Sequence, residues 1–276
     1  MSGGLSMTEN VWAMYFSATD TTKTTVCRIA DKLAEELACG RRTCNFTRPA
    51  AREEAYAFTE RDLVVFGTPV YAGRVPNVLL PFLKTVRGNG AKAVPVVLYG
   101  NRNFDDALAE LRDLLTGDGF VCTAAAAFVG EHAFSDVLAK GRPDDEDLAF
   151  ADQFALRLAD KIRRGTAGKR IEVPGESPQS EYFKPKGPDG RPIDIRRVRS
   201  LVNENCDNCG ICAKVCPMGS ISSEDVREYT GICIKCGACI KKCPQKARYY
   251  TDRDFLFHKE DLEKRLTGRG ECGVWL

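Results

Sequence analysis

Residues 206–217 read CDNCGICAKVCP, and residues 233–244 read CIKCGACIKKCP. Each run has the pattern C-x-x-C-x-x-C-x-x-x-C-P, and a constant shift of 27 residues (206 to 233) relates the two. Three thiolates spaced two residues apart can curl round one face of a metal cube, whereas the fourth lies too far along to close the same cube. The spacing therefore predicts two [4Fe-4S] clusters that exchange their fourth ligands.

This exchange assigns four cysteines to each cluster. We expect the first cluster on Cys206, Cys209, Cys212 and Cys243, and the second on Cys233, Cys236, Cys239 and Cys216. A zinc site is the alternative, but it needs only separate C-x-x-C pairs and would leave the third cysteine of each run idle. The odd total of 13 cysteines and the absence of a secretory signal in residues 1–6 argue against a disulfide framework.

Two other features accompany the runs. The remaining cysteines are expected to be small buried residues: Cys27, Cys39, Cys44, Cys122 and Cys272. The lysines beside the ligands have three interpretations, because they can guide an acidic partner, raise the cluster potential through their charge, or only offset the negative charge of the clusters on a solvated face: Lys214, Lys235, Lys241 and Lys242.

Composition limits the class of protein. The 276 residues are enough for two domains, and 43% hydrophobic with 28% charged residues excludes wholesale disorder. A net charge of +2 argues against a nucleic-acid binder. No apolar run approaches the roughly 18 residues that span a bilayer, so we expect a cytoplasmic protein.

Ahead of the cysteines, short apolar runs alternate with amphipathic segments. This alternation predicts a parallel sheet covered on both faces, with its ligand crevice at the carboxyl ends of the strands. We expect strands at Val11–Ser17, Arg42–Thr47, Asp62–Thr68, Ala93–Tyr99 and Phe120–Val129, and helices at Thr22–Ala38, Asn77–Val86, Asp105–Leu115 and Asp144–Ile162. The predicted domains are a sheet domain (1–165), a proline-rich linker that is either a packed strap or a free hinge (166–200), an iron–sulfur domain (201–250) and a polar tail (251–276).

Three loops follow the predicted strands. The first, Ser17-x-Thr19-x-Thr21-Thr22, places hydroxyls before a helix, where backbone N–H groups and the helix dipole favour an anion. The alternative interpretation is that these hydroxyl residues only cap the amino terminus of the helix. The loop lacks the G-x-G-x-x-G and G-x-x-x-x-G-K patterns, which argues against dinucleotides and nucleoside triphosphates and favours a mononucleotide. The others are GTPVYAGRVP at 67–76 and YGNRNF at 99–104.

The three loops resemble those with which flavodoxins bind FMN, and the cysteine runs resemble bacterial-type two-cluster ferredoxins. The whole chain is similar to flavodoxin–ferredoxin fusion proteins. This resemblance implies an α/β flavodoxin-like doubly wound parallel sheet (order 2-1-3-4-5) followed by a small α+β two-cluster ferredoxin domain. Two positions depart from it: Asp20 stands where flavodoxins commonly have glycine, and Thr21 where asparagine is frequent. A carboxylate near a phosphate repels it unless Asp20 points away.

The resemblance also implies which residues hold FMN. The phosphate is expected against Ser17, Thr19, Thr21 and Thr22, and the isoalloxazine against Tyr71 or Tyr99 in the loops that also hold Pro69. Its polar edge is expected to meet Val70, Gly73, Gly100 and Asn101, with Arg102 and Asn103 at the pyrimidine oxygens. After the fifth strand, His132 is a candidate catalytic proton shuttle or a local hydrogen-bonding residue. His258 has no partner residues in the sequence pattern.

Three functions stay open. The first is an electron-transfer protein that moves electrons between the clusters and FMN for a partner redox enzyme. The second is an FMN-dependent oxidoreductase that reduces a small organic substrate, with the ferredoxin domain as electron inlet. A closed pocket bounded by His132, Arg102 or linker aromatics favours this second function, and an exposed flavin edge favours the first. The third is a flavin-free docking platform for the ferredoxin.

Overall fold

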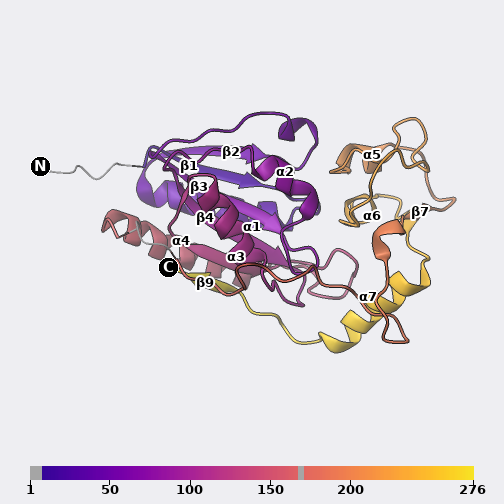
Figure 1. Cartoon of the computed structure of the whole chain (residues 1–276). Helices are drawn as coiled ribbons and strands as arrows, with labels where there is room; N and C mark the ends of the chain where they lie inside the picture. The colour runs from indigo at the N-terminus through magenta and orange to yellow at the C-terminus, as the bar shows by residue number, and fades with distance from the viewer. Residues whose placement is uncertain (1–7, 167–170) are drawn as a thin grey trace, which may run out of the picture.

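The computed structural model describes residues 8–166 and 171–276 (Figure 1). Residues 1–6, in which the sequence shows no secretory signal, and residues 167–170 of the predicted linker lie outside the described residues. Within the described ranges, no helix is both long and apolar enough to cross a membrane.

A parallel sheet forms the first part of the chain. Its order is β2 (Gly40–Asn45), β1 (Asn10–Tyr15), β3 (Asp62–Pro69), β4 (Lys92–Tyr99) and β6 (Ala125–Val129). The strand predicted at 120–129 is divided, because β5 (Val121–Cys122) pairs with the start of β4 and β6 with its end. With that division the predicted order 2-1-3-4-5 is confirmed, and the fold is the flavodoxin-like doubly wound sheet.

Alternate residues of each strand face opposite layers. Val11, Ala13 and Tyr15 of β1 pack under α1 (Thr21–Leu37) and α4 (Asp145–Arg163). Met14 instead belongs to the core under α2 (Leu80–Leu83) and α3 (Ala107–Gly117). This period of two follows from the pleat of a strand, and it buries both faces of the sheet (Figure 1).

The helix predicted at 77–86 is shorter in the structure. It consists of a 3-10 turn, η2 (Asn77–Leu79), and the single turn of α2. Pro81 has no N–H to donate to the Asn77 carbonyl, and the Leu80 N–H takes that acceptor instead. The proline therefore imposes the tighter turn at this end.

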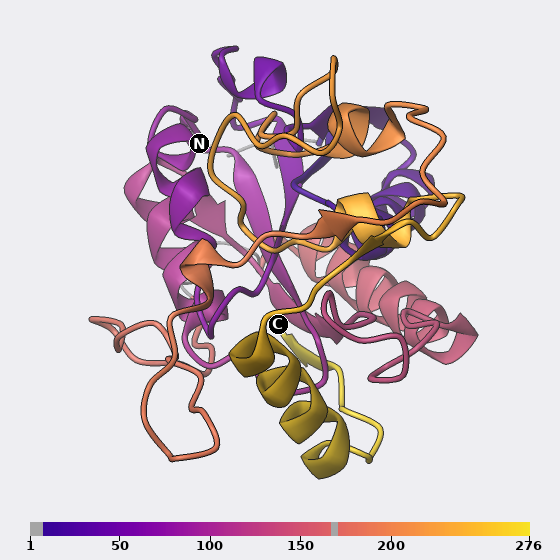
Figure 2. The same ribbon diagram turned by 90° about the vertical axis from the view of Figure 1, so that its right-hand side faces the viewer.

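The cysteine-rich region forms a small α+β unit. In it, β7 (Leu201–Val202) pairs antiparallel with β8 (Arg248–Tyr249), and α5 (Ile211–Val215) and α6 (Ala238–Lys241) lie between them in the chain. Figure 2 shows this unit across the end of the sheet at which the parallel strands finish. The predicted ligand crevice and the cysteine runs are thus neighbours.

The polar tail is more ordered than its composition indicates. It forms α7 (Arg253–Arg265), whose N-cap Asp252 accepts a hydrogen bond from the Phe255 N–H, and then β9 (Gly273–Trp275), which pairs antiparallel with β6. Asp252 before the helix and the spacing of Phe255, His258 and Leu262 along one of its faces are features of the sequence that could have indicated this helix. Residues 273–275 therefore add an antiparallel edge strand to the parallel sheet that the first part of the chain forms.

The linker is packed where the structure describes it. It contains the short 3-10 turn η3 (Ile195–Arg197). Another 3-10 turn, η1 (Ala50–Arg52), does not belong to the linker and lies in the sheet domain. The buried Asp106 carboxylate accepts hydrogen bonds from the N–H groups of Glu176 and Ser180. Further along, the Phe183 N–H donates to the Ala72 carbonyl at 2.9 Å. Of the two alternatives, these contacts form the packed strap.

Candidate functional site

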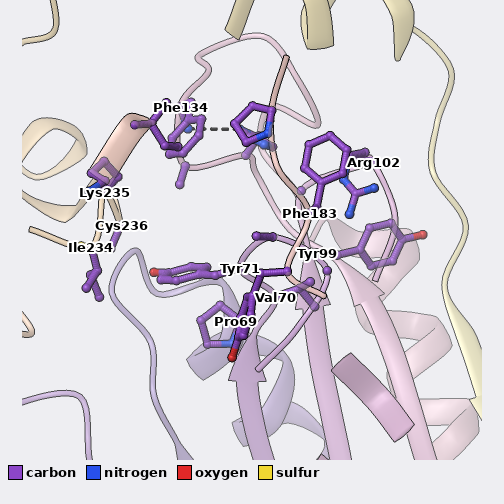
Figure 3. A pocket seen from close by; sticks show the side chains of 18 of the residues that line it. Pro69, Val70, Tyr71, Tyr99, Arg102, Phe134, Phe183, Ile234, Lys235 and Cys236 are labelled. Carbon is purple, nitrogen blue, oxygen red and sulfur yellow. Dashed lines mark hydrogen bonds between the residues drawn. The ribbon is translucent and has the colours of Figure 1, made fainter. Parts of the chain in front are cut away.

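A cavity of about 950 Å³ lies between the strand-end loops and the cysteine region (Figure 3). The loops after β1, β3, β4 and β6 line it together with the linker and the second cysteine run. Of the residues predicted to hold FMN, all except Ser17 and Asn101 contribute to this lining: Thr19, Thr21, Thr22, Pro69, Val70, Tyr71, Gly73, Tyr99, Gly100, Arg102 and Asn103.

The loop after β1, where the phosphate is expected, contains one residue with an unusual conformation. Asp20 has a φ of 69°, in the left-handed region that glycine adopts most easily. Its carboxylate does not cap α1 but lies 2.8 Å from the Lys242 ammonium of the second cysteine run. Ser17 is buried, and its Oγ accepts the Lys23 N–H at 3.0 Å, so it holds the loop closed from behind. The hydroxyl-bearing residues of this loop that line the cavity are Thr19, Thr21 and Thr22.

The two candidate tyrosines differ in their surroundings. The Tyr99 hydroxyl donates to the Glu271 carbonyl at 2.6 Å, which directs its phenol toward the tail. Tyr71 points toward the second cysteine run (Figure 3). Burial raises the pKa of Tyr71 well above its usual value, and the thiols of Cys236 and Cys233 add to that rise. Of the two candidate tyrosines, Tyr71 is therefore the one whose side chain lies between the flavodoxin-like loops and the cysteines.

The loop after β4 is held by distant segments. The Asn101 amide donates to the carbonyls of Leu266 and Gly268, and its Oδ1 accepts the Gly270 N–H, so its side chain anchors the tail. The Arg102 guanidinium lies 4.5 Å from the centre of the Phe183 ring of the linker and pairs with Asp105. The side chain of Arg102 thus joins this loop to the strap.

His132 is a neutral residue of the cavity wall. Its Nδ1 accepts the Phe134 N–H at 3.1 Å, which places the proton of the neutral ring on Nε2. Burial, followed by the charges of His258, Lys241 and Arg102, lowers the pKa of His132 from 6.5 to about 4. A Cβ on Gly100 would lie 2.4 Å from its Cδ2, so the ring requires glycine there.

His258 is a cavity residue that sequence reasoning missed. It lies on α7, is 6% exposed, and lines the same cavity as His132. Its ring centre is 6.5 Å from that of Phe134 and 6.3 Å from that of Phe183. Burial lowers its pKa as well, so both histidines favour the uncharged form.

The cysteines of each predicted ligand set lie near one another. One small cavity is lined by all four cysteines assigned to the first cluster, Cys206, Cys209, Cys212 and Cys243. In the second set, the thiols of Cys216, Cys233 and Cys239 act electrostatically on Cys236. The donor sets therefore fit two clusters. Among the described residues, no three His, Cys, Asp or Glu side chains form a site for a single metal ion.

The backbone repeats along with the cysteines. Gly210 and Gly237 have φ angles of 73° and 75° and begin α5 and α6. The fourth cysteine of each run accepts an N–H bond at 3.3 Å, Cys216 from Ser220 and Cys243 from Ala247. The same 27-residue shift that relates the sequences thus relates the conformations.

Three of the four lysines beside the ligands face the protein. The Lys241 ammonium donates to the Ser135 carbonyl at 2.8 Å and pairs with Glu131. Lys242 pairs with Asp20, and the buried Lys235 donates to the Arg196 and Cys233 carbonyls. Lys214 is exposed. These contacts join the second run to the flavodoxin-like domain and the linker.

The scattered cysteines follow their prediction in part. Cys44 and Cys122 are buried, whereas Cys27, Cys39 and Cys272 are partly exposed.

Comparison with known proteins identifies the C-terminal unit. Residues 193–248 match the family model described as a 4Fe-4S dicluster domain. No curated protein sequence matches the chain. The chain joins a flavodoxin-like domain to an iron–sulfur domain of the 4Fe-4S dicluster type.

Several solved structures are similar to the sheet domain. An archaeal flavodoxin is 14% identical, with 56% of this chain and 99% of that chain covered and a TM-score of 0.39. A Streptococcus pneumonia flavodoxin is 21% identical, with 55% and 99% covered and a TM-score of 0.37. A Fusobacterium nucleatum flavodoxin mutant bound to flavin mononucleotide is 14% identical, with 58% and 98% covered and a TM-score of 0.36.

Proposed function

We propose that this protein is an iron–sulfur flavoprotein that moves electrons between two [4Fe-4S] clusters and FMN on behalf of a partner redox protein. One observation carries the proposal. Cys233 and Cys236 line the same cavity as the threonines of the β1 loop and the aromatic ring of Tyr71. The proposed flavin site and the second set of cluster ligands therefore share a wall.

The residues present fit these groups. Thr19, Thr21 and Thr22 supply hydroxyls at the amino terminus of the 17-residue α1, where the helix dipole favours a phosphate. The charge of Asp20, which would oppose a phosphate, is paired with Lys242. When bound, FMN supplies a carrier of one or two electrons and each cluster a carrier of one.

A second candidate function is supported by the walls of the cavity. The linker covers one side with Tyr182 and Phe183, and the neutral His132 offers an Nε2 proton. These side chains exclude water and can hold a proton next to a bound molecule. We propose reduction of a small organic substrate, with the cysteine region as electron inlet, as the alternative to electron transfer to a partner protein.

Anaerobic reconstitution with iron, sulfide and FMN tests the proposal. We expect about eight iron atoms and one FMN per chain, because each cube holds four irons and the cavity has one hydroxyl cradle. Intact clusters without bound flavin would reject both flavoprotein functions and favour the docking platform. Wild type and Phe183→Ala are then compared with an electron-accepting protein and with small organic acceptors. If Phe183→Ala changes the rate of electron transfer to small organic acceptors but not the rate to the acceptor protein, the oxidoreductase is favoured.

A further inference from the structure

Arg248 is a buried cation beside the cysteine ligands. It is 4% exposed and lies in β8, close behind the second cysteine run. Arg248 lines the same small cavity as Cys206, Cys209, Cys212 and Cys243. A guanidinium keeps its charge in proteins, so this position places a permanent positive charge inside the iron–sulfur unit.

Arg248 differs from the other buried arginines in that no carboxylate in the described part of the chain balances its charge. Three arginines are buried among the described residues, and two of them have a carboxylate partner, since Arg112 pairs with Asp113 and Arg142 with Asp147. Arg248 has no ion pair with a carboxylate in ranges 8–166 and 171–276. Leaving a buried charge without an opposite charge is strongly destabilising.

The neutral contacts of Arg248 position it without neutralising it. Nη1 donates to the Ser200 hydroxyl at 3.1 Å and to the Tyr229 hydroxyl at 3.3 Å, while Nη2 donates to the Val226 carbonyl. Nε is buried and has no hydrogen-bond partner among the described residues. The ionisable groups that act on the guanidinium are the thiols of Cys212 and Cys239 and the Tyr229 phenol.

The internal repeat shows that the fold does not require a cation here. The 27-residue shift that relates the two cysteine runs places Ile221 at the position equivalent to Arg248 (248 − 27 = 221). Ile221 is also buried, at 5% exposed. An apolar side chain therefore fills the equivalent position in one half of the repeat, and the charge in the other half needs its own reason.

We propose that Arg248 is the counter-ion of the iron–sulfur clusters and that it raises the reduction potential of the cluster on Cys206, Cys209, Cys212 and Cys243. This inference rests on the proposed cluster binding. A cube held by four thiolates is anionic, and reduction adds one more negative charge. A fixed cation in a low-dielectric surrounding stabilises the reduced form more than the oxidised form. Ser200 extends the influence to the second cluster, because its hydroxyl lies 3.7 Å from the Cys239 sulfur.

Reductive titration followed by electron paramagnetic resonance tests this role in the full chain. In Arg248→Gln we expect the reduction equilibrium of the first cluster to weaken at least tenfold, which is about 59 mV for one electron. Arg248→Lys keeps the charge and should stay near the wild-type potential. The matched control is Arg227→Gln, which removes an exposed positive charge from the same unit and should leave the potential unchanged.

Iron and sulfide contents separate the outcomes. Wild-type protein without clusters would refute the proposed function itself. Clusters present at an unchanged potential in Arg248→Gln would overturn only the role of Arg248. If Arg248→Gln fails to keep its clusters while Arg248→Lys keeps them, the requirement for charge is supported. If both variants lose their clusters equally, the guanidinium has a structural role and the proposal is wrong.

Discussion

The Asp20 carboxylate lies 2.8 Å from the Lys242 ammonium, and this ion pair joins the proposed phosphate loop to the second cysteine run. The lysine adjoins Cys243, and the aspartate stands at the start of α1. Because both side chains are partly exposed, the pair adds little to stability. Its effect is local, because the Lys242 ammonium offsets the negative charge of Asp20 at the place where a phosphate is expected.

The ion pair predicts how FMN affinity responds to charge. Lys242→Gln leaves the Asp20 carboxylate unpaired, and we expect a loss of about 1 kcal/mol, or about fivefold, in FMN affinity. The double variant with Asp20→Asn should recover the wild-type value. Quenching of flavin fluorescence measures the dissociation constants, with Lys214→Gln as the exposed-lysine control. Equal losses in the single and double variants would show that Asp20 does not act on the phosphate.

Gly237 sets how closely the two domains approach. A Cβ at this position would lie 2.5 Å from the Ala133 carbonyl oxygen, and the φ of 75° is left-handed. Gly210 shares that conformation, with φ 73°, but a Cβ there meets nothing within 4 Å. Both alanine variants carry about 1 kcal/mol or more of backbone strain, and Gly237→Ala should lose about 1–3 kcal/mol more through the clash. Denaturant unfolding of the loaded protein measures the difference, and equal losses would contradict this interface.

The exchange of fourth ligands predicts two distinct cysteine phenotypes. Cys209→Ala should damage the cluster assigned to Cys206, Cys209, Cys212 and Cys243, whereas Cys236→Ala should damage the other cluster. Since Cys236 lines the large cavity and Cys209 is exposed outside it, only Cys236→Ala should abolish fast electron exchange with the flavin. Stopped-flow absorbance and electron paramagnetic resonance measure both effects. Selective loss of the second cluster in Cys209→Ala would refute the ligand assignment.

The strap is expected to slow the escape of flavin. Phe183 covers the cavity and stacks on the Arg102 guanidinium, so Phe183→Ala should speed FMN dissociation about tenfold, as loss of a cation–π contact and buried area implies. Tyr182→Phe is the matched control, because it removes only the hydrogen bond to the Val75 carbonyl and keeps the ring. Fluorescence recovery after dilution gives the rates. The idea fails if the two variants release FMN equally fast.

The neutral His132 makes stability depend on pH. Its pKa falls from 6.5 to about 4 on folding, so its contribution is fully present above about pH 6.5 and is lost as the pH drops toward 4. The full loss is up to about 3 kcal/mol. Chemical unfolding between pH 7 and 5.5 should therefore show a shallower pH slope in His132→Asn than in wild type. An unchanged slope in His132→Asn would contradict the burial of a neutral ring.

Much of the fold follows from patterns that are local in the sequence. The strand–helix alternation and the loops after the strands need only neighbouring residues, and the order of the parallel strands agreed with the prediction. The prediction was weaker where a distant partner decides the outcome. β9 forms only because β6 offers a free edge, and the Tyr99 and Asn101 side chains are engaged by carbonyls of residues 266–271.

The amino-acid sequence by itself was enough to predict the two proposed thiolate sets, since the spacing of cysteines along a chain is a covalent property that folding cannot alter. Only the tertiary structure decided that Tyr71 rather than Tyr99 faces the cysteines, that Asp20 meets Lys242, and that Arg248 is buried without a carboxylate. Those facts depend on packing between segments far apart in the chain. Charge and burial at such contacts arise only when the chain has folded.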